Sequence, residues 1–353
     1  MKKSLFMMGV AIAALSSCTQ NEVLDIAESN TIQFGNSYIG KPTRATIIDK
    51  VDNLDNFYVY ALTNPTDWSS SSSSAALFTN EKVYKGPNGW GYDNIKEYTP
   101  DNVYSFAAYS DGGAAGVDGK LADNTDGEGE NGVTFTAPDA SGNTAKLEIK
   151  NYETNGKDKD LLVAIFQGEL SDDNQEVSFA FKHALSQIKF NIHNPLGNNP
   201  IEIENFSVEG FKDKATLTYS EPAGEANIAW NTISGEKTIN ALEKDKAVTN
   251  DPAYGTYTII PQTVDNVLSG EGESAVKGLE VNITATLYKA DGTVLKKSQN
   301  FKAELTNLPT FEPGYIYNFN ATLNMGYIYF DNIEVEEWVP STPDTEMTPE
   351  VQP

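Results

Sequence analysis

Apolar and polar residues alternate along much of this chain with the period of a β-strand. In the clearest run, residues 279–288, every second residue from Leu279 onward is apolar, and the residues between are polar or tyrosine. Successive side chains of a strand point to opposite faces, so this pattern predicts strands with one face on a core and the other toward water. The same alternation covers residues 177–182, 188–192 and 315–323, and residues 57–62, 103–109 and 161–166 are predicted strands because they are rich in β-forming residues.

Helical periodicity is scarce, and only residues 240–247 are compatible with one short helix. Gly, Asn, Asp and Pro separate the strand patterns, and Lys289–Gly292 reads as a hairpin turn. Two stretches, residues 68–76 and 111–132, have the composition of long loops. Many short strands with such connections predict an all-β fold built from β-sandwiches.

The alternation changes phase between Phe181 and Ile188, and we place a domain boundary there. The chain then divides into an N-terminal β-sandwich over residues 31–183 and a C-terminal β-sandwich over residues 184–338, followed by a Pro-rich tail over residues 339–353. A chain of 353 residues has the length expected of about two domains.

The N-terminus has the features of a lipoprotein signal peptide. Two lysines precede a short apolar run, residues 5–15, which is too short to span a bilayer as a helix. Leu-Ser-Ser then leads to Cys18, the single cysteine of the chain. We expect residues 1–17 to be removed, Cys18 to be acylated, and residues 18–30 to form a lipidated tether to a membrane surface.

Composition narrows the functional classes. The formal net charge of −25 disfavours binding to nucleic acid and to anionic lipid surfaces. A single cysteine excludes an intramolecular disulfide and a thiolate metal cluster. No motif indicates another metal site or a cofactor, so we expect neither. The hydrophobic core must therefore hold the exported protein together.

Candidate catalytic residues are hard to find. The only two histidines, His183 and His193, lie inside strand-like runs, where a structural role is the more common one. The sequence contains no Gly-x-Ser-x-Gly elbow and no phosphate-binding glycine loop. Carboxylates are abundant, but no spacing selects an acid/base pair for glycoside hydrolysis. We therefore predict that the chain is not an enzyme, and a hydrolase remains an option without a site.

Two further features have weak functional interpretations. Residues 123–130 offer clustered oxygen ligands for calcium, but their spacing does not match the EF-hand pattern, and we favour a solvated loop. Trp68 and Trp90 flank a loop with six consecutive serines and could stack on a sugar. They support the alternative of a permanently anchored, surface glycan-binding lipoprotein.

The order of several short motifs resembles the fimbrillin family, the lipoprotein-precursor subunits of type V pili in anaerobic Gram-negative bacteria. The resemblance covers almost the whole chain. Its motifs are the lipobox before Cys18, Thr31–Gly35, Pro42–Ala45, Phe181–Ile188, Tyr257–Gln262, Pro313–Tyr317 and Ile333–Trp338.

The resemblance implies a fold and a mode of assembly. The fold would be two transthyretin-like β-sandwich domains in tandem. An arginine-specific protease would cut behind Arg44, leaving Ala45 as the new N-terminus, and the first strand, with Ile32 and Phe34 facing inward, would leave. A strand from another fimbrial subunit would fill the vacated edge by donor-strand exchange. The protein would serve cell adhesion, at the outer membrane before processing and in the fimbrium afterwards.

The C-terminus leaves the position in the pilus open. The tail over residues 339–353 contains four prolines, which cannot donate ladder hydrogen bonds, so it is a poor donor strand. The proline-rich tail therefore favours a tip or accessory subunit, which needs a groove to accept a strand but does not have to donate one. Alternatively the strand that carries Ile333, Val335 and Trp338 detaches and donates, as a shaft subunit requires. The sequence does not identify the surface ligand.

Overall fold

The computed structural model is an all-β protein, which confirms the predicted fold class. Every regular element in the described part of the chain is a β-strand, and no helix there could cross a membrane. The N-terminal segment with Cys18, the Arg44–Ala45 bond and the Pro-rich tail lie outside the described part. The structure describes residues 30–35, 37–39, 54–65, 67–68, 74–87, 89–112, 118–124, 129, 131–154, 160–171, 174–195, 197–221, 227–241, 247–248, 253–264, 278–324 and 326–338.

A seven-stranded sheet forms the centre of the first half of the chain. The middle stretches of its long inner strands are mostly apolar on both faces, because the sheet is covered on both sides. In β6, for example, Phe106 packs in one core and the next residue, Ala107, packs in another on the opposite face. In spatial order the strands are β2 (Tyr38–Ile39), β11 (Ala180–His183), β9 (Asp160–Glu169), β6 (Val103–Gly112), β3 (Asn56–Asn64), β4 (Ala75–Gly86) and β5 (Gly89–Gly91).

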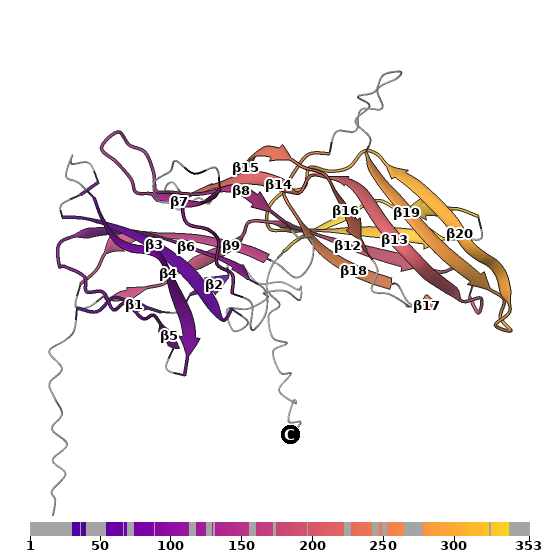
Figure 1. The fold of residues 1–353 in the computed structure, drawn as a ribbon, viewed down its shortest axis with the longest axis horizontal. Coiled ribbons are helices and arrows are strands. Elements are labelled where there is room, and N and C mark those ends of the chain that lie inside the picture. The colour runs from indigo at the N-terminus through magenta and orange to yellow at the C-terminus, as the bar shows by residue number, and fades with distance from the viewer. Residues whose placement is uncertain are drawn as a thin grey trace, which may run out of the picture.

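A four-stranded sheet covers one face of this central sheet and joins strands from distant parts of the chain (Figure 1). Leu217 lies opposite Ile149 in the antiparallel ladder, so a hairpin from the second half of the chain completes a sheet of the first half. In spatial order its strands are β15 (Asn227–Ser234), β14 (Lys214–Ser220), β8 (Lys146–Glu153) and β7 (Gly132–Thr136).

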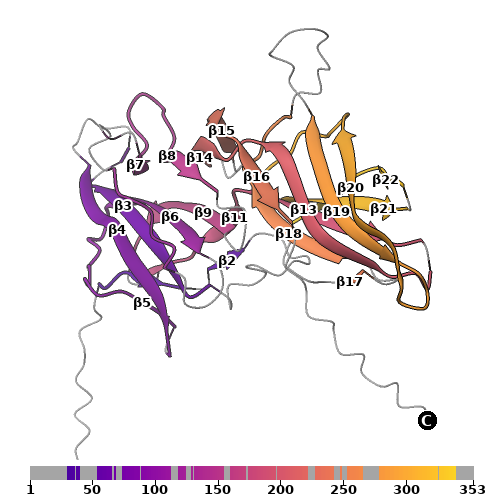
Figure 2. The same cartoon turned by 45° about the vertical axis from the view of Figure 1, so that its right-hand side comes forward.

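Two five-stranded sheets enclose the core of the second half, which lies at the orange and yellow end of the molecule in Figures 1 and 2. The alternation predicted over 279–288 is present, with Leu279, Val281 and Ile283 all buried. One sheet contains β18 (Ala253–Ile259), β12 (Ser186–His193), β21 (Tyr315–Leu323), β22 (Ile328–Phe330) and β23 (Glu334–Glu337). The other contains β16 (Lys237–Asn240), β13 (Ile201–Phe211), β17 (Ala247–Val248), β19 (Leu279–Tyr288) and β20 (Val294–Leu305).

Some local expectations are corrected by the structure. The short helix over 240–247 does not form at its ends, because Asn240 closes β16 and Ala247 opens β17. Pairing with β13 and burial of Ile239 in the C-terminal core outweigh the local helical pattern. The loop expected over 111–132 is shorter, since Asp111 still belongs to β6 and Gly132 already belongs to β7.

The phase change near residue 185 has a packing cause. Ala184 and Leu185 are adjacent in sequence and both are fully buried in the core beneath the four-stranded sheet. This is where the chain passes from β11 into β12, so neither strand's alternation extends through it.

The shared four-stranded sheet should link the stability of the two halves. Leu217→Ala removes a fully buried side chain from β14, and we expect a loss of about 2–5 kcal/mol. Because β14 pairs with β8, the fluorescence of Trp90 in the first half should report the same shift in urea midpoint, measured with the other three tryptophans replaced by Phe. Thr218→Ala, on the opposite face of β14, is the control, and an unchanged Trp90 transition in Leu217→Ala would contradict the linkage.

Candidate functional site

The first described segment, residues 30–35 and 37–39, lies as an extended strand in a groove of the first half, and we term it the plug strand. Within it, β1 (Gln33–Phe34) runs parallel to β10 (Glu176–Val177), and β2 continues in parallel along β11. On its other side the Ile32 amide donates to the Lys96 carbonyl at 3.0 Å. The plug strand therefore has main-chain partners on both edges.

Phe34 fills the centre of this groove. Its side chain is only 5 % exposed, and Ile32 beside it is fully buried, whereas Gln33 between them is exposed. Together the two buried side chains contribute about 3–6 kcal/mol by transfer estimates. Five rings surround Phe34 at centroid distances of 5.4–6.5 Å, and they belong to Phe57, Phe78, Tyr92, Phe106 and Phe179.

Polar contacts fix the register of the plug strand. The Tyr92 hydroxyl donates to the Ile32 carbonyl at 2.8 Å, and burial raises the pKa of Tyr92, which keeps this donor neutral. The Gly35 amide donates to the Val177 carbonyl at 3.1 Å. A Cβ atom at Gly35 would lie 1.4 Å from the Glu176 carboxylate, so a larger residue requires that carboxylate to move.

The structure brings Ile32 and Phe34 together in one core, as the sequence predicts for an inward-facing first strand. Their displacement remains a prediction. The plug strand ends in the described part at Ile39, five residues before Arg44 in the sequence. The lipidation residue Cys18 and the cleavage residues Arg44 and Ala45 fall outside the described residues.

The candidate donor residues Ile333, Val335 and Trp338 lie at an edge of the C-terminal sandwich. β23 pairs antiparallel with one end of β21, and all four of its residues are exposed, including Val335 at 49 %. Trp338 is different, because it is buried and its amide donates to the Gly314 carbonyl at 2.6 Å. The exposed edge strand β23 is therefore followed directly by a buried residue, Trp338, which we term the anchor.

Beneath that anchor lies a buried pair that the sequence does not reveal. His183 Nδ1 is 2.8 Å from Asp160 Oδ2, and both side chains are buried. The His183 ring stacks on Trp338 with centroids 4.2 Å apart. The only sequence signal near this pair is the change in the phase of the alternation near residue 185. His193, in contrast, is exposed at the end of β12.

The other candidate residues are spread over the first half. Trp90 is half-buried with its ring 4.9 Å from Phe57, so its inner face is part of the aromatic core, and Trp68 is half-buried. The Asp123 carboxylate accepts a hydrogen bond from Tyr60 at 2.8 Å. The described residues contain no group of three or more His, Cys, Asp or Glu side chains that could hold a metal ion.

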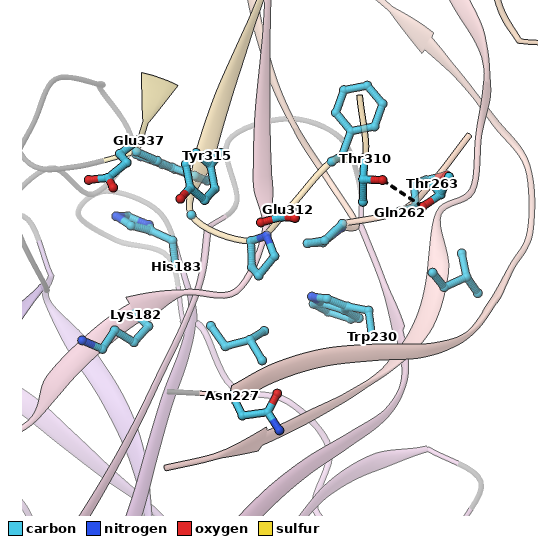
Figure 3. A pocket seen from close by; sticks show the side chains of 17 residues that line it. Lys182, His183, Asn227, Trp230, Gln262, Thr263, Thr310, Glu312, Tyr315 and Glu337 are labelled. Carbon is cyan, nitrogen blue, oxygen red and sulfur yellow. Dashed lines mark hydrogen bonds between the residues drawn. The ribbon is translucent and has the colours of Figure 1, made fainter. Parts of the chain in front are cut away.

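A cleft of about 690 Å³ opens where the two halves meet, and we term it the junction cleft (Figure 3). Strand β11 contributes Lys182 and His183, and β15 contributes Trp230. The turn before β21, Glu337 at the end of β23 and the following residue Trp338 form the opposite wall. No sequence pattern indicated this cleft, because its residues come from distant segments.

Comparison with known proteins gives a family and a fold. A family model described as Fimbrillin-like matches residues 43–338. A fimbrial protein from Bacteroides vulgatus has a TM-score of 0.51 at 17 % identity, with 86 % of this chain and 100 % of that chain covered. A comparison with curated proteins found no matching relative.

Other solved structures resemble the chain less closely. A candidate cell adhesion protein from Bacteroides uniformis has a TM-score of 0.47 at 16 % identity, covering 87 % of this chain and 98 % of that chain. The fimbrial anchor protein Mfa2 from Porphyromonas gingivalis has a TM-score of 0.32 at 13 % identity, covering 87 % of this chain and 98 % of that chain.

The packing of Phe34 predicts how firmly the plug strand is held. Phe34→Ala should lower the free energy of opening this segment by about 3–5 kcal/mol, because the cavity left among five rings cannot collapse fully. Native-state hydrogen exchange at the Ile32 and Gly35 amides measures this, since both are hydrogen-bonded only while the strand is in place. Gln33→Ala, at an exposed position, should change it by less than about 0.5 kcal/mol. Equal effects of the two substitutions would contradict this view of the groove.

Proposed function

Because the chain belongs to the fimbrillin-like family, we propose that it is a fimbrial subunit that is exported as a lipoprotein and assembled by donor-strand exchange. Cleavage behind Arg44 severs the plug strand from the rest of the chain. Another subunit's strand then enters the groove, and the resulting fimbrium serves adhesion at the cell surface.

The observation that carries this proposal is the groove around Phe34. The plug strand has hydrogen-bonded neighbours on both sides and alternates buried Ile32 and Phe34 with exposed Gln33. An incoming extended strand with apolar residues at the same two positions can replace both the main-chain bonds and the side-chain burial. An empty groove would expose an unpaired β11 edge and an aromatic slot, so it has a strong tendency to accept a strand.

The position of Arg44 suits this exchange. It lies between the plug strand, which is described up to Ile39, and β3, which begins at Asn56. The family model also starts at residue 43, next to this arginine and after the plug strand. Cleavage there leaves the plug strand held only by non-covalent contacts, and acylated Cys18 remains with the severed piece.

We favour a tip or accessory subunit over a shaft subunit. A shaft subunit must release a C-terminal strand, and the candidate β23 is followed directly by Trp338, which is 3 % exposed and stacked on His183. The remaining chain, residues 339–353, is rich in proline. An acceptor groove without a readily released donor is the combination that a terminal subunit needs.

The alternative function is a permanently anchored glycan-binding lipoprotein. It requires that Cys18 stays attached in cells and that the plug strand never leaves. Trp90 gives it little support, because its ring packs against Phe57.

Limited digestion with an arginine-specific protease tests the proposal. Mass spectrometry should find a new N-terminus at Ala45, and a synthetic peptide of residues 30–39 should replace the severed plug strand in the groove. The same peptide with Ser at positions 32 and 34 should fail to bind, because it lacks the buried side chains. Protein that polymerises alone after cleavage is a shaft subunit, whereas protein that only accepts the peptide is a terminal one.

Arg44→Ala provides the matched control for this digestion. This variant should remain uncut at that bond, should keep its plug strand, and should not bind the peptide. If Arg44→Ala accepts the peptide as readily as the cleaved protein, strand exchange does not depend on this cleavage, and the proposal fails.

A further inference from the structure

The junction cleft has the size and position of a small-molecule site. Its volume of about 690 Å³ lies within the range of about 300–1,000 Å³ usual for ligand pockets, which often form where two domains meet. The plug strand, Ile333 and Val335 do not line it, and Trp338 is the one candidate donor residue that does, so strand exchange does not account for the cleft as a whole.

Aromatic side chains form two of its walls. The Trp230 indole is half-buried and is fixed in place, because its Nε1 donates to the Ala184 carbonyl at 2.7 Å and its ring lies 5.6 Å from Tyr152. Tyr315 is also half-buried, at the start of β21. In Figure 3 the two rings lie on different sides of the opening, with Glu312 between them in this view. Each ring leaves part of its surface open to a ligand.

Hydrogen-bonding groups at the rim are unused within the described part of the chain. The Tyr315 hydroxyl, the side-chain amide of Asn227 and the Glu312 carboxylate make no hydrogen bond there, and Asn227 and Glu312 are exposed. Other polar groups of the cleft serve the fold. Gln262, for example, donates to and accepts from the backbone of Lys212 at 2.9 Å.

Charge indicates which ligands suit the cleft. Its rim combines Lys182 with Glu312 and Glu337, so no compact patch of one sign is present among its lining residues. The whole chain carries −25, and this field disfavours anionic ligands such as acidic sugars. A neutral ligand with one apolar face and many hydroxyl groups fits both the rings and the free donors and acceptors.

We propose that the junction cleft binds a neutral sugar, as a single pyranose or a short oligosaccharide. The C–H face of a pyranose ring packs on Trp230, and Asn227, Glu312 and Tyr315 bind its hydroxyl groups. This inference rests on the proposed adhesive function, for which it supplies the class of ligand.

Isothermal titration of the uncleaved protein tests this site. The probes are neutral trisaccharides, namely maltotriose, cellotriose, mannotriose and triacetylchitotriose, with 3′-sialyllactose as the anionic comparison. At least one neutral trisaccharide should bind, and sialyllactose should bind more weakly. Asn227→Ala and Glu312→Gln should each weaken binding of the neutral ligand about tenfold. The first substitution removes a hydrogen bond to a sugar hydroxyl and the second replaces a charge-assisted hydrogen bond by a weaker neutral one, and either change costs about 1–1.5 kcal/mol.

Matched variants separate the site from the fold. Tyr315→Ala should reduce binding of the neutral ligand, whereas Trp90→Phe, in the other core, should leave it unchanged. The proposal is overturned if none of the four neutral probes binds at a concentration of 10 mM, which corresponds to a binding free energy weaker than about 3 kcal/mol. Binding that Asn227→Ala and Glu312→Gln leave unchanged, or a preference for sialyllactose, overturns it as well. Because the protein is uncleaved, these failures would not bear on strand exchange.

Discussion

The packing of Phe34 among five aromatic rings is the interaction on which the functional architecture depends. A short strand supplies this ring, and the strand is joined to the rest of the molecule through a segment that contains Arg44. Buried main-chain groups need partners, and here the plug strand provides them to both β10 and the 96–98 segment. A replacement that reproduces these contacts is extended, runs parallel to β10, and carries apolar side chains at two alternate positions.

The central sheet provides a structural basis for a subunit that stays folded during the proposed strand exchange. The two faces of β6 and β3 belong to different cores, and Phe34 contributes to only one of them. The other core is closed by the four-stranded sheet, whose β14–β15 hairpin comes from the second half of the chain. Opening the groove thus removes packing from one face, while the opposite face keeps its cover and its connection to the C-terminal sandwich.

Alternation in the sequence predicts strands and their inward faces well, because both depend on local burial. β19 and the inward-facing Ile32 and Phe34 are examples, and the order of short motifs indicates the family. Pairing partners are a different matter. Nothing in residues 214–234 shows that they pair with β8, since period two identifies a face and not a neighbour. The junction cleft and the His183–Asp160 pair are likewise formed by residues that are brought together only by tertiary packing.

Strand β11 links the groove to the junction cleft. Ala180 and Phe181 pair with the plug strand, while Lys182 and His183, at the other end of the same strand, line the cleft. Trp338 stacks on His183 and is itself part of the cleft wall, so release of β23 with its anchor would open that wall. Donation of β23 and an intact cleft are therefore incompatible in one subunit. Under the proposed strand exchange, a subunit that binds a ligand in this cleft keeps its C-terminal strand, which agrees with the tip or accessory position that we propose.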